Sequence, residues 1–352
     1  MFRWIFVLAA VLGFAGCSVH PRPEDTTGFN TVQIVAKVRC EVRDALRAFI
    51  IGSLRDPRRL EVFPQYAVLA EELQIGARDW RHLRDHLKFF RVDPNTMGVF
   101  EIYNGGTIAY EFLFNITENN KHAAGFDLLR TFTRGKLTAG LAGSSTLDRN
   151  NIRNFGIADN FEDLVTLFNE DYCGPGSENG TEPLHRRTAN IVYPVTGSLG
   201  LHELVGAFLN LNQSGNLIGL PNAPAEVSRL PTISESMKFT TTFTGGGSLG
   251  WTGVDHGERA WRLSKATFAT ANTREDVHTL RMVLKLPLES EKRTRTVAEQ
   301  RLAAAGVPIA KPASVRDLVK QSAIVDLTLA AEKEYMETKI LVGRDARVLL
   351  PE

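Results

Sequence analysis

Apolar residues recur at helical spacing over much of the chain. Between Asn30 and Ile51 they return at every third or fourth position, which is the spacing of one face of an α-helix. Asn30 and Gln33 have the pattern of a capping box at the start of this helix, and Gly52 is expected to end it. By the same spacing, further helices are predicted over residues 66–90, 160–169, 198–212, 289–305 and 314–340.

In residues 99–157 and 237–286, strand-like runs of alternating apolar and polar residues replace the helical spacing. The run Asn104-Gly105-Gly106 between two such segments predicts a hairpin turn. Strands joined by hairpins pair in antiparallel sheets. The sequence therefore predicts an α+β fold with mainly antiparallel strands and with N-terminal, intervening and C-terminal helices.

A glycine-rich run from Gly245 to Gly250 lies inside the second strand-rich stretch. It matches the GxGxxG pattern of dinucleotide-binding loops and the GxSxG pattern of hydrolase nucleophiles. Both motifs need a helix after the turn, whereas residues 251–254 continue as a strand. We therefore interpret this run as a hairpin turn without a catalytic role.

The two strand-rich stretches resemble each other in sequence. The offset between matched residues falls by one from each match to the next, as small changes in turn length would produce. Duplication of one antiparallel unit explains the pattern, and the alternative is that any two alternating stretches align this well. The matched segments are 112–117 with 239–244, 136–138 with 262–264, and 149–152 with 274–277.

The N-terminus has the pattern of a secretory signal. Arg3 is followed by an unbroken apolar stretch from Trp4 to Ala15, which is too short to span a bilayer of about 30 Å as a permanent helix. Small residues then precede Cys17. An ordinary signal peptide or a short anchor, with Cys17 incidental, is the alternative interpretation.

Residues 14–17, Phe-Ala-Gly-Cys, resemble the lipobox of bacterial lipoproteins. This resemblance implies cleavage before Cys17, a diacylglycerol on its thiol and acylation of its new amino group. Ser18 in the following position implies sorting to the outer membrane. Two or three acyl chains hold a protein at a bilayer stably, so the membrane itself is the first expected partner.

These features divide the chain into seven segments. They are a signal peptide (1–16), the lipidated cysteine with a polar tether (17–29), an N-terminal helical region (30–98), a first β unit with following helices (99–212), a Pro/Gly-rich connector (213–236), a second β unit (237–288) and a C-terminal helical region (289–352).

Export also changes what the cysteines imply. If lipid occupies Cys17, then Cys40 and Cys173 remain as an even pair in an oxidising compartment. Cys40 falls on a predicted helix and Cys173 in a glycine-rich loop, so their separation in space is open. The alternatives are a disulfide and two separate buried thiols.

The charge balance excludes one class of partner. The chain has 41 Lys and Arg against 40 Asp and Glu, and removal of Arg3 with the signal leaves a neutral body. A neutral body lacks the positive charge by which proteins bind nucleic acid, so we expect no nucleic-acid partner.

A pair of histidines provides the best candidate for a metal site. His82 and His86 lie four residues apart, the spacing at which one helix face can chelate zinc. The run 82–86 is similar to the His-x-x-Glu-His pattern of inverzincin metallopeptidases, with Asp85 in the place of the glutamate. The sequence identifies no third ligand, and a solvated basic helix face is the alternative.

The sequence thus favours a lipid-anchored lipoprotein of the cell envelope that faces the periplasm. It predicts a binding, structural or assembly role, with another envelope protein as partner and with neither a cofactor nor a catalytic site. The second hypothesis is a periplasmic zinc-dependent hydrolase that uses His82 and His86.

Overall fold

A computed structural model describes most of the chain. It covers residues 21–22, 25, 30–132, 135–173, 199–213, 230–252, 262–288, 290–309 and 313–348. The signal segment, Cys17 and the remainder of the predicted tether lie outside these residues. Lipidation of Cys17 therefore stays a prediction.

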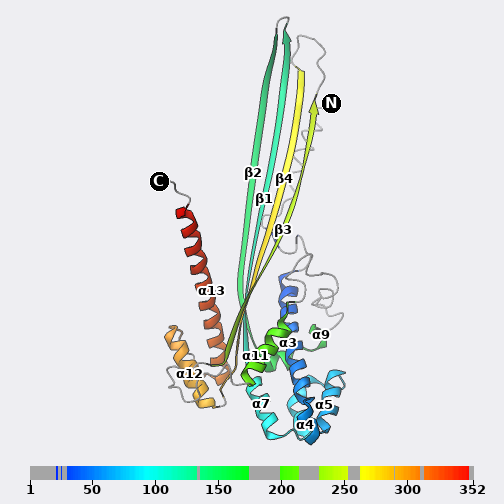
Figure 1. Cartoon of the computed structure of the whole chain (residues 1–352), viewed down its shortest axis with the longest axis vertical. Helices are drawn as coiled ribbons and strands as arrows, with labels where there is room; N and C mark the ends of the chain where they lie inside the picture. Colours follow the sequence, from blue (N-terminus) through cyan, green and yellow to red (C-terminus); the bar gives the residue numbers. More distant parts are fainter. Residues whose placement is uncertain are drawn as a thin grey trace. The chain divides into compact units, whose positions relative to one another are not determined.

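Four long antiparallel strands form one sheet in the order β2-β1-β4-β3 (Figure 1). Two hairpins build the sheet, since β1 pairs with β2 and β3 pairs with β4. Together with the helices, this sheet confirms the α+β class. The strands are β1 Thr107–Phe132, β2 Gly135–Asn160, β3 Thr232–Thr252 and β4 Arg262–Lys285.

Ion pairs across the central strands show how the hairpins are joined. Arg274 of β4 lies 3.1 Å from Glu118 of β1, and Arg281 of β4 lies 2.9 Å from Glu111 of β1. Residue numbers thus rise along one strand as they fall along the other, as antiparallel pairing requires. The shorter strand segments expected from the alternation are parts of continuous strands.

The chain divides into two compact units, and the strands contribute to both. The first, which we call the sheet unit, comprises Met1–Gly28, Phe114–Arg153 and Phe239–His278. The second, the helical unit, comprises Phe29–Leu113, Asn154–Lys238 and Thr279–Glu352.

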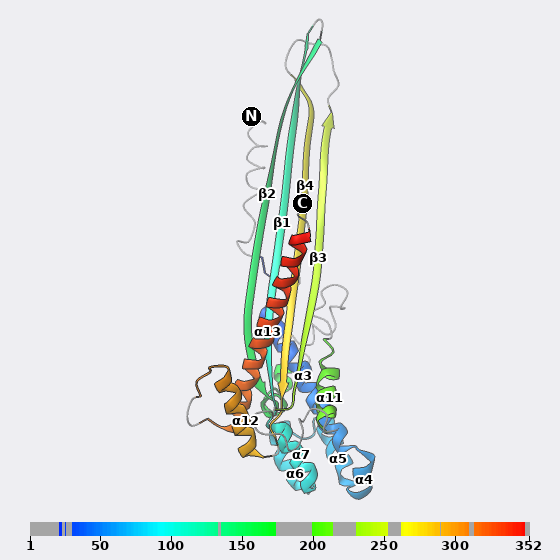
Figure 2. The same cartoon turned by 60° about the vertical axis from the view of Figure 1, so that its left-hand side comes forward.

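Helix α3 (Thr31–Leu54) organises the helical unit by packing on α5, α8 and α11. Figure 2 shows α3 with α5 and α11. The predicted capping box is present, because Asn30 accepts from the Gln33 amide and Gln33 accepts from the Asn30 amide. The helix continues through Gly52 to Leu54, so the predicted end was wrong by two to three residues. The neighbouring helices are α4 Pro57–Val62, α5 Gln65–Gln74, α6 Leu83–Phe89, α7 Pro94–Asn104, α8 Phe161–Thr166, α9 Glu170–Cys173 and α11 Leu201–Gln213.

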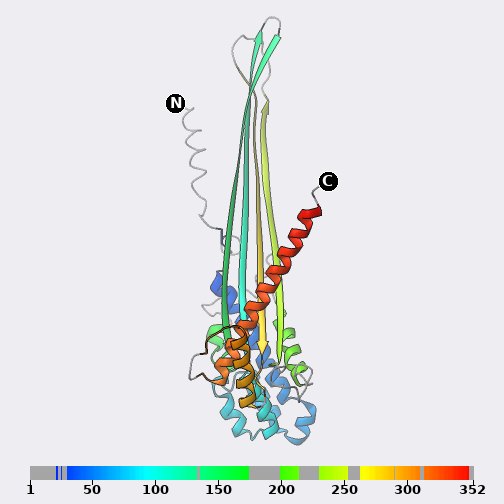
Figure 3. The same cartoon turned by 90° about the vertical axis from the view of Figure 1, so that its left-hand side faces the viewer.

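The two C-terminal helices, α12 (Glu291–Ala304) and α13 (Val315–Val348), pack against each other (Figure 3). A cluster of buried apolar side chains joins them. Ser314 and Asp317 cap α13 through reciprocal side-chain to backbone hydrogen bonds. Among the helices in the described parts of the chain, none is both long and apolar enough to cross a membrane.

The predicted strand at 99–103 and the hairpin after it were wrong. Residues 94–104 form α7, with Phe100 and Tyr103 buried. The glycines that follow serve close packing instead of a turn. A Cβ on Gly105 would lie 2.7 Å from Pro287 Cγ, and one on Gly106 would lie 2.6 Å from Phe161 Cδ2.

The predicted glycine turn at 245–250 was also wrong, because this run lies inside β3. A Cβ on Gly246 would lie 2.8 Å from the carbonyl oxygen of Thr270 in β4. At this position glycine permits a close approach of neighbouring backbones.

Candidate functional site

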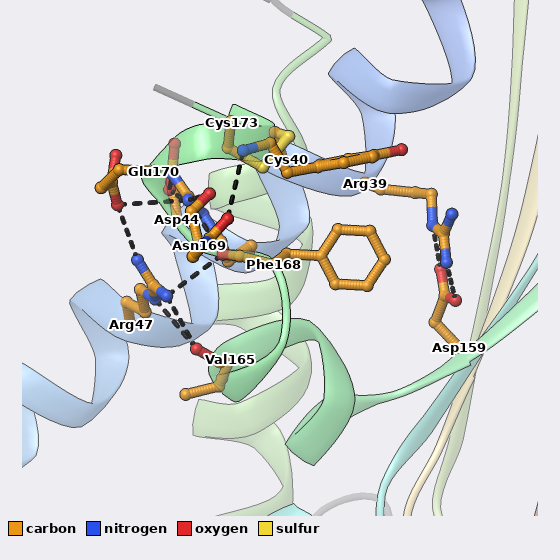
Figure 4. Close-up of a disulfide and its surroundings, with 12 residues drawn as sticks. Arg39, Cys40, Asp44, Arg47, Asp159, Val165, Phe168, Asn169, Glu170 and Cys173 are labelled. Atoms are coloured by element: carbon orange, nitrogen blue, oxygen red, sulfur yellow. Dashed lines mark hydrogen bonds and ion pairs between the residues drawn. A yellow bond between two sulfur atoms is a disulfide. The ribbon is translucent and has the colours of Figure 1, made fainter. Parts of the chain in front are cut away.

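Helix α3 carries a row of three arginines, Arg39, Arg43 and Arg47, on the face that meets α8 and α9. Their spacing of four residues places successive guanidinium groups on one side of the helix. Figure 4 shows Arg39 and Arg47. Arg39 Nε donates to Asp159 Oδ2 at 2.8 Å, and its guanidinium lies 4.3 Å from the centre of the Phe168 ring.

The other two arginines bind the backbone at the end of α8. Arg47 donates to the carbonyl oxygens of Val165 at 2.8 Å and Phe168 at 3.2 Å. Arg43 donates to the carbonyl oxygens of Phe168 and Asn169, both at 3.1 Å. The last carbonyls of a helix have no partner within the helix. These guanidinium groups therefore complete the hydrogen bonding of α8 and hold it against α3.

The charge of Arg47 is preserved despite its burial. Burial, followed by the repulsion of Arg43, lowers the pKa of Arg47 to about 10, so the guanidinium stays protonated at neutral pH. Glu170 opposes this effect by accepting from Arg47 at 2.9 Å and from Arg43 at 3.2 Å. A single carboxylate thus serves both arginines.

A disulfide between Cys40 and Cys173 joins α3 to α9 beside this row. The two Cα atoms lie 5.6 Å apart, and the bridge closes a loop across a sequence separation of 133 residues. The sequence left a disulfide and two separate thiols open, and the structure has the disulfide.

A cleft of about 830 Å³ opens next to the arginine row, between α3, the segment after α5, and the end of α8. Its charged groups are paired within the protein. Arg78 Nε lies 2.5 Å from Glu72, and Arg81 Nε donates to Asp79 at 2.7 Å. Two hydrogen bonds from Arg81 lower the pKa of Asp79 to about 2. These charged groups therefore compensate one another.

The structure uses the predicted zinc ligands in other ways. His86 Nε2 lies 3.1 Å from the carbonyl oxygen of Asp79, and Nδ1 lies 3.4 Å from Arg78. His82 is exposed and lies 3.8 Å from Asp85. Within the described ranges, no three His, Cys, Asp or Glu side chains are grouped so that they could hold a metal ion.

In the sheet unit, Arg274 connects the central strands to the N-terminal segment. It donates to both carboxylate oxygens of the fully buried Asp276, at 2.8 and 3.1 Å, and to the carbonyl oxygen of Arg22 at 2.7 Å. Asn151 of β2 donates to the carbonyl oxygen of Pro21, also at 2.7 Å. Residues 21 and 22, which were predicted to lie in a polar tether, are therefore bound to the sheet.

His278 adds a second buried group on β4. Burial lowers its pKa to about 4, with Arg274 acting in the same direction and Asp276 opposing it. The imidazole packs edge-on against Phe114 with ring centres 4.8 Å apart. Near neutral pH this side chain is therefore an uncharged part of the packing.

The arginine row was not recognised in the sequence, although a signal was present. Arg39, Arg43 and Arg47 recur every four residues in a helix whose other positions are mostly apolar. This pattern indicates a cationic stripe on a packed face. Its side-chain partners, Asp159 and Glu170, are acidic residues far away in the sequence. Its other partners, the carbonyl groups of Val165, Phe168 and Asn169, are main-chain atoms, which no side-chain pattern reveals.

Comparison with known proteins places the chain in one family. A family model described as "Uncharacterised protein y4kA" matches residues 20–308, which include both hairpins and the helices from α3 to α12. The uncharacterized protein y4kA of Sinorhizobium fredii (strain NBRC 101917 / NGR234) is 27% identical over 303 residues, which are 82% of this chain and 84% of that protein. The chain therefore belongs to the family of the uncharacterised protein y4kA.

Proposed function

We propose that this protein is a lipoprotein of the cell envelope, anchored by lipid on Cys17, sorted to the outer membrane and facing the periplasm. Its role is assembly or binding within the envelope, without catalysis. The lipobox-like run at residues 14–17 motivates the anchor.

The disulfide between Cys40 and Cys173 is the observation that carries the proposal. Disulfides persist in oxidising compartments such as the periplasm and are rare in the cytosol. A bridge between two elements of the helical unit, packed beside ion pairs and aromatic rings, is a structural part of this fold. It supports export independently of the signal sequence.

The N-terminal contacts indicate which unit the anchor serves. Pro21 and Arg22 are bound to Asn151 and Arg274 of the sheet unit. Four residue steps separate Cys17 from Pro21, and an extended chain covers about 14 Å in that number of steps. A lipid on Cys17 would therefore hold the sheet unit close to the membrane surface.

The contacts around His86 do not favour the zinc hydrolase. A metal ligand needs a free ring nitrogen and neighbours that accept a positive charge. The carbonyl group of Asp79 fixes the ring through Nε2, as it would in a metal-bound histidine, and the nitrogen that would be left for a metal, Nδ1, faces the cationic Arg78. These contacts support a structural role for His86 and, with it, the proposal without catalysis.

Replacement of Cys17 tests the anchor directly. Cells producing the wild-type protein or Cys17→Ala are labelled with a radioactive fatty acid, and the label is expected on the wild type alone.

The matched control is Ser18→Ala, which keeps the acceptor cysteine and should stay labelled. An unlabelled wild-type protein, or a Cys17→Ala variant that still carries the label, would contradict the proposed lipidation. Processing of the wild type also predicts a new N-terminus at residue 17, which mass spectrometry of the purified protein measures.

A further inference from the structure

The sheet unit has two open edges in the part of the chain that the structure describes. The strand order β2-β1-β4-β3 gives β2 and β3 one neighbouring strand each. Within this unit their edges comprise residues 135–153 of β2 and 239–252 of β3. Outer strands present unpaired backbone donors and acceptors that can pair with a further strand.

Both edges carry exposed apolar side chains. Edge strands are often protected by charged side chains, and residues 239–252 of β3 contain none. Leu141 of β2 is 68% exposed, and Leu249 of β3 is 76% exposed. Side chains two residues apart share one face of a strand, so each edge has its own apolar row. The rows are Leu137, Leu141 and Leu147 on β2, and Phe243, Leu249 and Trp251 on β3.

The order of the strands makes the two edges complementary. In the sequence alignment of the hairpins, β1 corresponds to β3 and β2 corresponds to β4. The internal junction between β1 and β4 therefore joins the first strand of one hairpin to the second strand of the other. The two free edges are also formed by the first strand of one hairpin, β3, and the second strand of the other hairpin, β2. Placing β3 of one molecule against β2 of another repeats the internal junction.

We propose that the partner of the sheet unit is a second copy of this chain, which pairs its β2 edge with β3 and continues the antiparallel sheet. The interface is heterologous, since two different edges meet, so each pair leaves one edge of each kind for a further copy. The inference deepens the proposed assembly role by naming its partner and rests on that role, whereas it does not require the lipid.

The internal junction also predicts the register between copies. Glu118 of β1 lies opposite Arg274 of β4. In the alignment, Glu118 corresponds to Gly245 of β3, and Arg274 corresponds to Arg149 of β2. Gly245 of one copy would therefore lie opposite Arg149 of the second copy. In an antiparallel pair, moving forward along one strand corresponds to moving backward along the other. Four residues after Gly245 and four residues before Arg149, Leu249 would therefore lie opposite Ser145.

This register brings the exposed apolar rows together. Leu249 would lie diagonally across from Leu147 of the second copy, and Trp251 would lie diagonally across from Leu141. Diagonal neighbours in adjacent strands are close enough for large side chains to pack. Association would thus remove from water the apolar surface that each edge exposes.

Cysteine crosslinking in solution tests the register. The mature chain carrying Cys17→Ala is exported through a conventional cleavable signal, and a second version of it carries Ser145→Cys and Leu249→Cys. Under mild oxidation we expect a ladder of reducible multimers on a non-reducing gel. Ser144→Cys with Leu249→Cys is the matched control, because Ser144 points to the opposite face of β2, and at least a tenfold lower yield is expected.

Mixing the single variants tests whether the two edges differ. Ser145→Cys mixed with Leu249→Cys should give dimers only, and neither variant alone should crosslink. Dimers of Leu249→Cys alone would overturn the pairing of β3 with β2. Light scattering of the Cys17→Ala parent, which carries no engineered thiol, should show species larger than a monomer.

A parent that stays monomeric at high micromolar concentration, together with no crosslink in the version carrying Ser145→Cys and Leu249→Cys, would overturn the proposal. Binding of that monomer to phosphatidylglycerol vesicles would instead assign the apolar rows to a lipid surface, which also overturns it. Every protein in the crosslinking and light-scattering experiments lacks Cys17. A negative result in them therefore does not affect the labelling test of the lipid anchor, and the pairing between copies and the anchor can be refuted separately.

Discussion

At the scale of single residues, Lys37 of α3 shows the cost of a buried charge. Its side chain has no exposed surface, and its amino group has no hydrogen-bond partner among the described residues. Burial lowers the pKa of Lys37 to about 8, although the nearby Glu41 acts in the opposite direction. Glu41 is itself engaged as the acceptor for the amides of Leu199 and Leu201 at the start of α11.

Lys37→Met is therefore expected to stabilise the protein. Below pH 8 the lysine is charged in both the folded and the unfolded state. Burying this charge therefore lowers the free energy of unfolding, by an amount on the order of 3 kcal/mol at pH 7 for the pKa shift from 10.5 to about 8. Above pH 8 the folded state holds the lysine neutral while the unfolded state keeps its proton up to pH 10.5. The stability of the wild type then rises with pH relative to the variant.

Urea unfolding of both proteins at pH 7 and pH 9 measures this effect. The advantage of Lys37→Met should shrink by about 1 kcal/mol between these pH values. Lys88→Met on the exposed face of α6 is the control, and it should change stability by less than about 0.5 kcal/mol. An advantage of equal size at both pH values would show that the charge of Lys37 is not its cause.

At the scale of elements, the junction between α7 and β1 depends on a glycine without a side chain. A Cβ on Gly106 would lie within 2.8 Å of Phe161 and Leu286, which are both buried. Gly106→Ala is expected to lower the free energy of unfolding by about 1–3 kcal/mol through overpacking. Gly98→Ala, inside α7 with open space around its Cβ, should instead raise it by roughly 0.5–1 kcal/mol. Chemical denaturation of both variants measures the contrast, and equal effects would refute the packing explanation.

The bridge between α3 and α9 offers a second test at this scale. Opening a loop with a sequence separation of 133 residues is expected to cost about 2–5 kcal/mol. Cys173→Ser should therefore unfold at lower temperature than the wild type, and a reductant should lower the wild type to the same value. The variant should not respond to the reductant. A wild type that is insensitive to reduction would mean that the arginine row alone holds α9.

At the scale of the whole molecule, the two units have different physical characters. The helical unit contains the buried apolar clusters, the disulfide and the arginine row. The sheet unit binds the N-terminal segment through Arg274 and presents exposed apolar rows on β2 and β3. The proposed anchor and the proposed pairing between copies therefore belong to the same unit.

Local signals in the sequence predicted much of this fold. The capping box at Asn30 lies where it was expected, since it involves atoms only three residues apart. The α+β class followed from the change between helical spacing and alternation. By contrast, Gly105 and Gly106 were assigned to a hairpin, because the reason for glycine there is contact with Pro287 and Phe161, far away in sequence.

The sequence by itself determined the export signal pattern, the neutral body, the class of fold and the even cysteine pair, because composition and short-range periodicity encode these features. Only the tertiary structure decided that Cys40 meets Cys173, that Arg43 and Arg47 bind the carbonyl groups after α8, and that β1 pairs with β4. Each of these contacts joins segments that are more than 100 residues apart in the sequence. Such contacts depend on how the whole chain folds, and neither a main-chain acceptor nor the order of strands produces a residue pattern that would predict them.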